Sequence, residues 1–195
     1  MSLENITSNP RNRIIAIVVA VGIALALFRG CAPSTPGVLP EASASTLLDG
    51  ALAKQQAGDV AGARADLTTI VNSSNALEMP ELVVTSYFNL GVLAQAEKKN
   101  TDAINFYKRA LVIDPTYTPA LFNLAIAYTP VDANAAIFFY DMLLSVSPKD
   151  ANALYNKGLL EWNLGNTATG KKLLERAIKI APALADQLPD NIVLK

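Results

Sequence analysis

The stretch that decides the fold is residues 84–117, VTSYFNLGVLAQAEKKNTDAINFYKRALVIDPTY. Pro115 ends an apolar helical segment near the close of this stretch. Pro148 ends a similar segment 33 residues later, and Pro182 ends another 34 residues after Pro148. Self-similarity at a fixed period of this length is typical of repeat proteins built from small helical units. The spacing therefore predicts a repeated helix pair.

The same stretch resembles the tetratricopeptide repeat family, in which each unit is two antiparallel helices. Seven positions carry the resemblance: Tyr87, Leu90, Gly91, Ala103, Tyr107, Ala110 and Pro115. Residues 118–150 and 151–184 keep most of this pattern, although Lys157 and Gly170 replace the usual leucine and alanine. The resemblance implies an all-α fold, a right-handed α-solenoid.

A fourth, degenerate unit is expected at residues 44–77, where Leu47, Ala51, Gly58, Ala63 and Leu67 keep the same offsets. An insertion of about six residues separates it from Val84. The chain would then hold about four helix pairs. A tail at 185–195 follows them, and residues 183–188, which run into this tail, could form a short last helix covered by residues 192–194 or by a partner.

Small residues predict where the two helices of a unit approach closely. Gly91 is expected to lie against Ala103, and Gly158 against Gly170. A glycine within a helix costs about 1 kcal/mol relative to alanine, so close packing has to offset that cost. Glycine at these positions therefore favours a tightly packed pair.

The N-terminal part contains an apolar run. From Ile14 to Phe28 all fifteen residues are apolar or glycine, with Arg11 and Arg13 before the run and Arg29 after it. The run is shorter than the roughly 20 residues of a usual span, but flanking arginines can extend to the headgroups. We expect a cytoplasmic segment at 1–13, a single transmembrane helix at 14–30 and a proline-rich linker at 31–43.

Two alternatives to an uncleaved anchor remain open. One is a cleaved secretory signal, although the A-x-A motif at 42–44 lies far from the apolar run. The other is a lipoprotein, because Gly30-Cys31 is similar to the end of a bacterial lipoprotein signal, while Phe28 and Arg29 depart from it. Cys31, the single cysteine, is thus a candidate lipidation site.

The distribution of basic residues predicts the orientation of the anchor. Arg11, Arg13 and the amino terminus precede the run, whereas Arg29 is followed by no basic residue until Lys54. The positive-inside rule therefore places the N-terminus in the cytoplasm and the repeats outside it, in the cell envelope if the source is bacterial.

Composition excludes several functions. Sixteen basic and seventeen acidic residues give a net charge of -1, so no electrostatic attraction to nucleic acid is expected. The sequence has no histidine, and it shows neither a phosphate-binding glycine loop nor a cluster of metal ligands. We expect no enzyme activity, no cofactor and no metal.

The family resemblance implies a protein-binding groove lined by the first helix of each pair. The residues that it assigns to the groove are Phe88, Asn89, Val92, Phe122, Asn123, Ile126, Tyr155, Asn156, Leu159 and Trp162. They are aromatic, aliphatic or amide side chains and suit a peptide or a helix. We expect a non-catalytic, membrane-anchored scaffold for assembly, maturation or secretion of envelope proteins. The alternative is a structural subunit that self-associates through its repeats or its anchor as a homo-oligomer.

Overall fold

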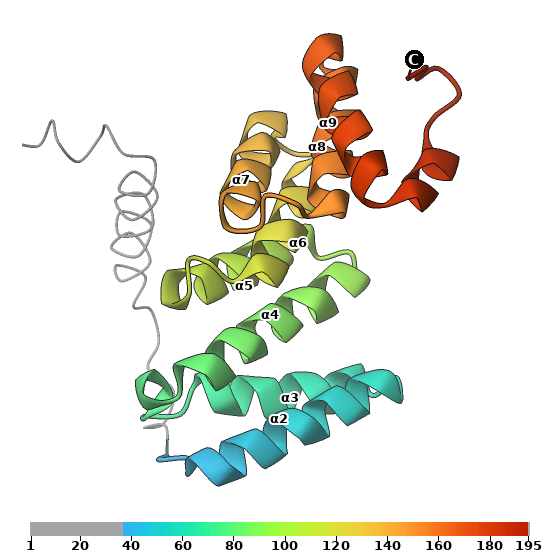
Figure 1. Ribbon diagram of the computed structural model, residues 1–195. Coiled ribbons are helices and arrows are strands. Elements are labelled where there is room, and N and C mark those ends of the chain that lie inside the picture. Colours follow the sequence, from blue (N-terminus) through green and yellow to red (C-terminus); the bar gives the residue numbers. More distant parts are fainter. Residues whose placement is uncertain (1–36, 195) are drawn as a thin grey trace, which may run out of the picture. The chain divides into compact units, whose positions relative to one another are not determined.

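The computed structural model describes residues 37–194, and this part of the chain is all-α (Figure 1). The helices form four consecutive pairs, which confirms the expected fold of about four helix pairs. The α-helices are α2 (Glu41–Gln56), α3 (Val60–Val71), α4 (Pro80–Ala96), α5 (Asn100–Ile113), α6 (Thr118–Tyr128), α7 (Ala133–Val146), α8 (Ala151–Asn163) and α9 (Thr167–Ile180). Two 3-10 helices, η2 (Ala76–Glu78) and η3 (Pro182–Gln187), complete the described elements.

The chain divides into two compact units, the first ending at Ala120 and the second beginning at Leu121. In the first unit α2 lies beside α3, and α4 beside α5 (Figure 1). One core joins these helices, with Leu67, Ile70 and Leu90 almost fully buried in it. The first helix pair, which the sequence marked as degenerate, therefore contributes to the same core as the second.

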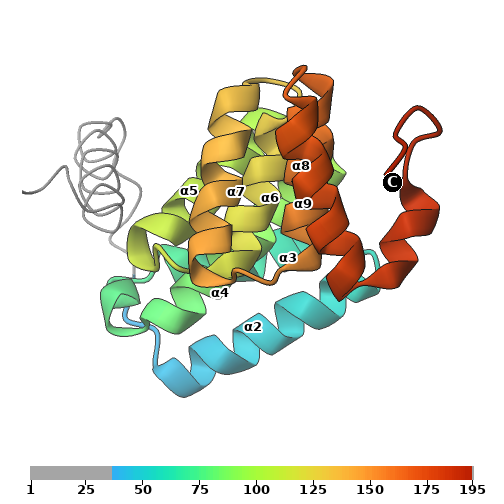
Figure 2. The same ribbon diagram turned by 45° about the horizontal axis from the view of Figure 1, so that its top comes forward.

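The second unit has its own core between α8 and α9, which lie side by side (Figure 2). Leu154, Leu174 and Ala177 are fully buried there. Its other pair, α6 and α7, is joined by aromatic contacts, with Phe122 edge-on to Tyr140 at 6.3 Å between ring centroids.

Local sequence signals set the helix ends. Pro80 occupies the first turn of α4, where its missing N–H costs nothing. Asp150 caps α8, its carboxylate accepting a hydrogen bond from the Ala153 N–H at 2.8 Å. Helix α2 begins at Glu41, inside the segment 31–43 that we expected to be linker. The reason is that Pro40 precedes residues that favour a helix, and Glu41 places a carboxylate in the first turn.

The surroundings of the glycines confirm close helix packing and identify the side chain nearest to Gly91. A β-carbon on Gly170 would lie 2.8 Å from the Gly158 carbonyl oxygen, as the expected pairing requires. A β-carbon on Gly91 would instead overlap the ring of Tyr107, one turn beyond Ala103. Ala103 and Tyr107 lie on the same face of α5, so the expectation named the right face, and the atoms of that face nearest to the added β-carbon belong to Tyr107.

Among residues 37–194 no helix combines the length and the apolar character that crossing a membrane requires. The anchor expected at 14–30, the cytoplasmic segment at 1–13 and Cys31 lie outside the described residues.

Candidate protein-binding surface

Helix α4 carries the three groove candidates of the first unit. Phe88 is half-buried, and its ring centroid lies 5.9 Å from that of Tyr107 and 5.7 Å from that of Tyr117. Val92, one turn further along, is also half-buried. Asn89 is 9% exposed, and its amide donates a hydrogen bond to the Thr85 carbonyl oxygen at 2.8 Å. Phe88 and Val92 therefore have apolar surface that a ligand could contact, whereas the amide of Asn89 is used in a hydrogen bond within α4.

Helix α6 carries three more candidates, and all three are half-buried: Phe122, Asn123 and Ile126. Phe122 rests edge-on against Tyr140 of α7, which fixes the orientation of its ring. This helix therefore presents an aromatic, an amide and an aliphatic side chain, each with part of its surface still accessible.

Helix α8 carries the last four candidates, and one of them is internal. Tyr155 is 6% exposed, and its hydroxyl donates a hydrogen bond to the Gln187 carbonyl oxygen at 2.5 Å. Tyr155, which the resemblance assigned to the groove, is thus internal, because the chain beyond α9 returns and gives its hydroxyl a partner. Leu159 and Trp162 are half-buried and pack against the core of this last pair.

Asn156 is half-buried and forms a hydrogen bond with the hydroxyl of Tyr140, which also bonds Thr129. Burial raises the pKa of Tyr140 to about 12, and the two hydrogen bonds oppose part of that rise. Tyr140 is therefore a neutral, buried hydrogen-bonding centre in the second unit, and Asn156 is one of its partners.

Lys157 stands where the repeat pattern has leucine. Its side chain is only 11% exposed, and its ammonium lies 2.5 Å from the Asp141 carboxylate on α7. The aliphatic stem replaces the leucine, while the carboxylate neutralises the charge. This ion pair contributes no free cation to the candidate groove residues.

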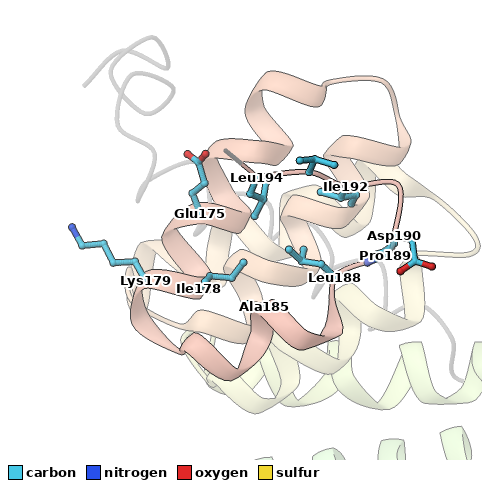
Figure 3. Close-up of a pocket in the computed structure, with 10 residues that line it drawn as sticks. Glu175, Ile178, Lys179, Ala185, Leu188, Pro189, Asp190, Ile192 and Leu194 are labelled. Carbon is cyan, nitrogen blue, oxygen red and sulfur yellow. The ribbon is translucent and has the colours of Figure 1, made fainter.

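A hollow of about 640 Å³ that the sequence did not indicate lies between α9 and the C-terminal tail (Figure 3). Ile178, Leu188 and Ile192 point into it, whereas the Lys179 ammonium points away. Ile192 is 6% exposed, and Leu194 packs against the same core. Val193 is 61% exposed, so two of the three tail residues expected to cover the end do so.

In sum, Asn89 and Tyr155 are internal, and the other eight candidates keep part of their surface accessible. None of the ten candidates is charged, and none of them forms an acid–base pair. The accessible candidates of each unit can bind by apolar contact, and those of the second unit also by amide hydrogen bonding.

Comparison with known proteins gives a family match in two segments. Residues 84–117 and 151–184 match the tetratricopeptide repeat family. The human protein O-mannosyl-transferase TMTC3 is 32% identical in an alignment over 142 residues that covers 70% of this chain. The chain spans 15% of the length of that protein.

Several solved structures share the fold. A crystal structure of MamA covers 95% of this chain and 98% of its own, with 18% identity and a TM-score of 0.63. A tetratricopeptide repeat protein from Parabacteroides merdae covers 71% of this chain and 54% of its own, with 23% identity and a TM-score of 0.61. YrrB, described as having an unusual peptide-binding site, covers 91% and 85%, with 17% identity and a TM-score of 0.58.

Proposed function

Because this chain is a tetratricopeptide repeat protein, whose repeats form a protein–protein interaction domain, we propose that it is a non-catalytic scaffold held at a membrane. Its repeats would bind a peptide segment of another protein. Residues 14–30 would anchor it, with the N-terminus in the cytoplasm and the repeats on the other side. The client would be an envelope protein undergoing assembly, maturation or secretion.

The observation that carries the proposal is the half-buried state of uncharged side chains on α4, α6 and α8. Leu90, Leu124 and Leu154, on the same helices, are at most 1% exposed and leave no area for a ligand. Val92, Ile126 and Leu159 instead keep area that a ligand can cover. Burying such area is the main favourable term in peptide binding.

Two further points support this assignment. YrrB, which shares the fold, is described as having a peptide-binding site, and a peptide is the ligand class that we propose here. The chain also has no histidine, so imidazole chemistry is absent from the sequence and a binding role is favoured over a catalytic one.

Photo-crosslinking from intact membranes tests the binding role. A photoreactive residue at Ile126, which is half-buried on α6, should capture one defined protein. The same residue at Lys172, exposed on α9, is the matched control and should capture far less of that protein. If the photoreactive residue at position 126 captures only a second copy of this chain, the alternative of a self-associating structural subunit is favoured. Equal capture of the partner at positions 126 and 172 would contradict a defined binding surface.

Membrane anchoring needs its own test. The full chain should stay in the pellet after alkaline carbonate extraction, and protease added outside intact cells or spheroplasts should digest the repeats. Release into the supernatant would overturn the anchor. Loss of residues 1–30 with acylation of Cys31 would replace it with a lipid anchor.

A further inference from the structure

Residues 37–39 are held against the loop between α3 and α4 by three hydrogen bonds. The Ser74 N–H donates to the Gly37 carbonyl oxygen at 3.2 Å. The Asn75 side chain binds Leu39 twice, its Oδ1 accepting from the Leu39 N–H and its Nδ2 donating to the Leu39 carbonyl oxygen, both at 2.9 Å. This clasp fixes the entry of the chain relative to the loop.

Neighbouring residues in and next to the clasp differ in burial. Leu39 and Ala76 pack against the core of the first unit. Val38 and Leu77, next to them in the sequence, are 75% and 90% exposed. We call Val38 and Leu77 the apolar tip. The clasp and η2 hold both side chains in water, which is unfavourable for leucine and valine unless something covers them.

The sequence restricts what can reach the apolar tip. Gly37 follows Phe28, the last residue of the apolar run, by nine positions. Nine residues span at most about 32 Å when fully extended. If residues 14–30 cross a membrane, the tip therefore remains close to that membrane surface.

We propose that the apolar tip inserts into the headgroup region of the bilayer that holds the anchor. The inference rests on the proposed anchoring at residues 14–30. Two side chains are far too small an area for a protein partner, since a stable interface buries about 800 Å² on each side. A lipid surface requires no such area, because the anchor already holds the chain there.

The charges nearby define the kind of lipid surface. Glu41, Glu78 and Glu81 are exposed and lie within four residues of the tip in the sequence. The nearest basic residues in the sequence are Arg29, nine residues before Val38, and Lys54, at the far end of the 16-residue helix α2, about 24 Å along the helix axis. The three carboxylates therefore outnumber the one arginine on the side of the anchor. Anionic lipids would be repelled. The insertion is therefore apolar and favours zwitterionic phosphatidylcholine.

Fluorescence quenching in liposomes tests the inference on the full chain. Trp162→Phe removes the single native tryptophan, and Leu77→Trp then places a probe on the tip. In phosphatidylcholine with brominated acyl chains, the probe should lose a large part of its fluorescence, because insertion brings it close to the bromine atoms. Val112→Trp in the same background is the control, since Val112 is also an exposed apolar residue of the first unit, at 37%. The tryptophan of this control should lose little fluorescence.

Quenching at position 77 that weakens when phosphatidylglycerol is added supports the inference. Equal quenching at 77 and 112 overturns it, and so does absence of quenching at 77. Carbonate extraction of the same liposomes separates the two proposals. If the protein stays with the liposomes but the probe is not quenched, the proposed anchor stands and the proposed tip contact is refuted. If the protein is released from the liposomes, both proposals are refuted. If Leu77→Trp lowers the melting temperature, Val38→Trp replaces it as the probe.

Discussion

Gly91 of α4 and Tyr107 of α5 pack so closely that a β-carbon on residue 91 would lie 2.6 Å from Cδ1 of the tyrosine ring. Tyr107 is fully buried, and its hydroxyl donates to the Gln95 side-chain oxygen at 2.8 Å, so the ring cannot move aside freely. Gly91→Ala should therefore lower the free energy of unfolding by about 1–3 kcal/mol, despite the better helix propensity of alanine. Urea denaturation followed by circular dichroism measures this change.

Gly50→Ala is the matched control for Gly91→Ala. Gly50 lies inside α2, and the nearest atom to an added β-carbon is the Asp66 Oδ2, at 3.9 Å. The substitution should raise the free energy of unfolding by about 0.5–1 kcal/mol, because helix propensity acts without a clash. The same sign of change at both positions would contradict this account of the first unit.

Ser86 is a buried polar residue whose replacement should stabilise the protein. It is 0% exposed, and its hydroxyl has no hydrogen-bond partner in the described structure. The repeat spacing places Ala120 and Ala153 at the equivalent positions. Ser86→Ala should raise the free energy of unfolding by about 1–2 kcal/mol, since it removes an uncompensated desolvation cost.

Ser45→Ala separates desolvation from helix propensity. Ser45 lies in α2 and is exposed, so the substitution should add only the small propensity gain of alanine. If Ser86→Ala raises the free energy of unfolding by no more than Ser45→Ala does, the buried hydroxyl of Ser86 does not destabilise the protein.

The proline spacing and the glycine pattern predicted the helix pairs, because period and small residues are properties of the sequence itself. Side-chain partners were harder to predict. Tyr155 fits the outward pattern but bonds Gln187, 32 residues away, and no periodicity encodes that contact. Asn89 is internal because its amide binds the Thr85 carbonyl oxygen of its own helix. The hollow beside α9 likewise depends on how the tail folds back.

Lys98 adopts a conformation that lysine rarely takes. Its φ is 61°, in a turn between paired helices where the first and last pairs have Gly58 and Gly165, at 83° and 88°. The left-handed region costs a residue with a β-carbon about 1–2 kcal/mol. Lys98→Gly should therefore raise the free energy of unfolding by about 0.5–1 kcal/mol after the entropy cost of glycine. Gly165→Ala should lower the free energy of unfolding. A lower free energy of unfolding for Lys98→Gly would contradict the idea that the backbone at residue 98 is strained.

Alkaline pH should destabilise the protein through Tyr140. An unfolded tyrosine releases its proton near pH 10, whereas Tyr140 in the folded protein keeps it until about pH 12. The stabilisation is complete below pH 10 and is lost as the pH rises through 12, with a total of at most about 3 kcal/mol. Tyr140→Phe should flatten this decline in urea denaturation across that pH range. Identical slopes for the two proteins would assign the decline to other groups, among them Tyr155, whose pKa burial also raises.

The C-terminal tail should stabilise the last helix pair through one side chain and not through its neighbour. Ile192 is 6% exposed and belongs to the core of α8 and α9, whereas Val193 is 61% exposed. Ile192→Ala should lower the free energy of unfolding by about 2–3 kcal/mol, since it leaves a space beside α9. Val193→Ala should change it by less than about 0.5 kcal/mol. Hydrogen exchange of α9 amides measures both, and equal protection in the two variants would mean that the tail only rests on the surface.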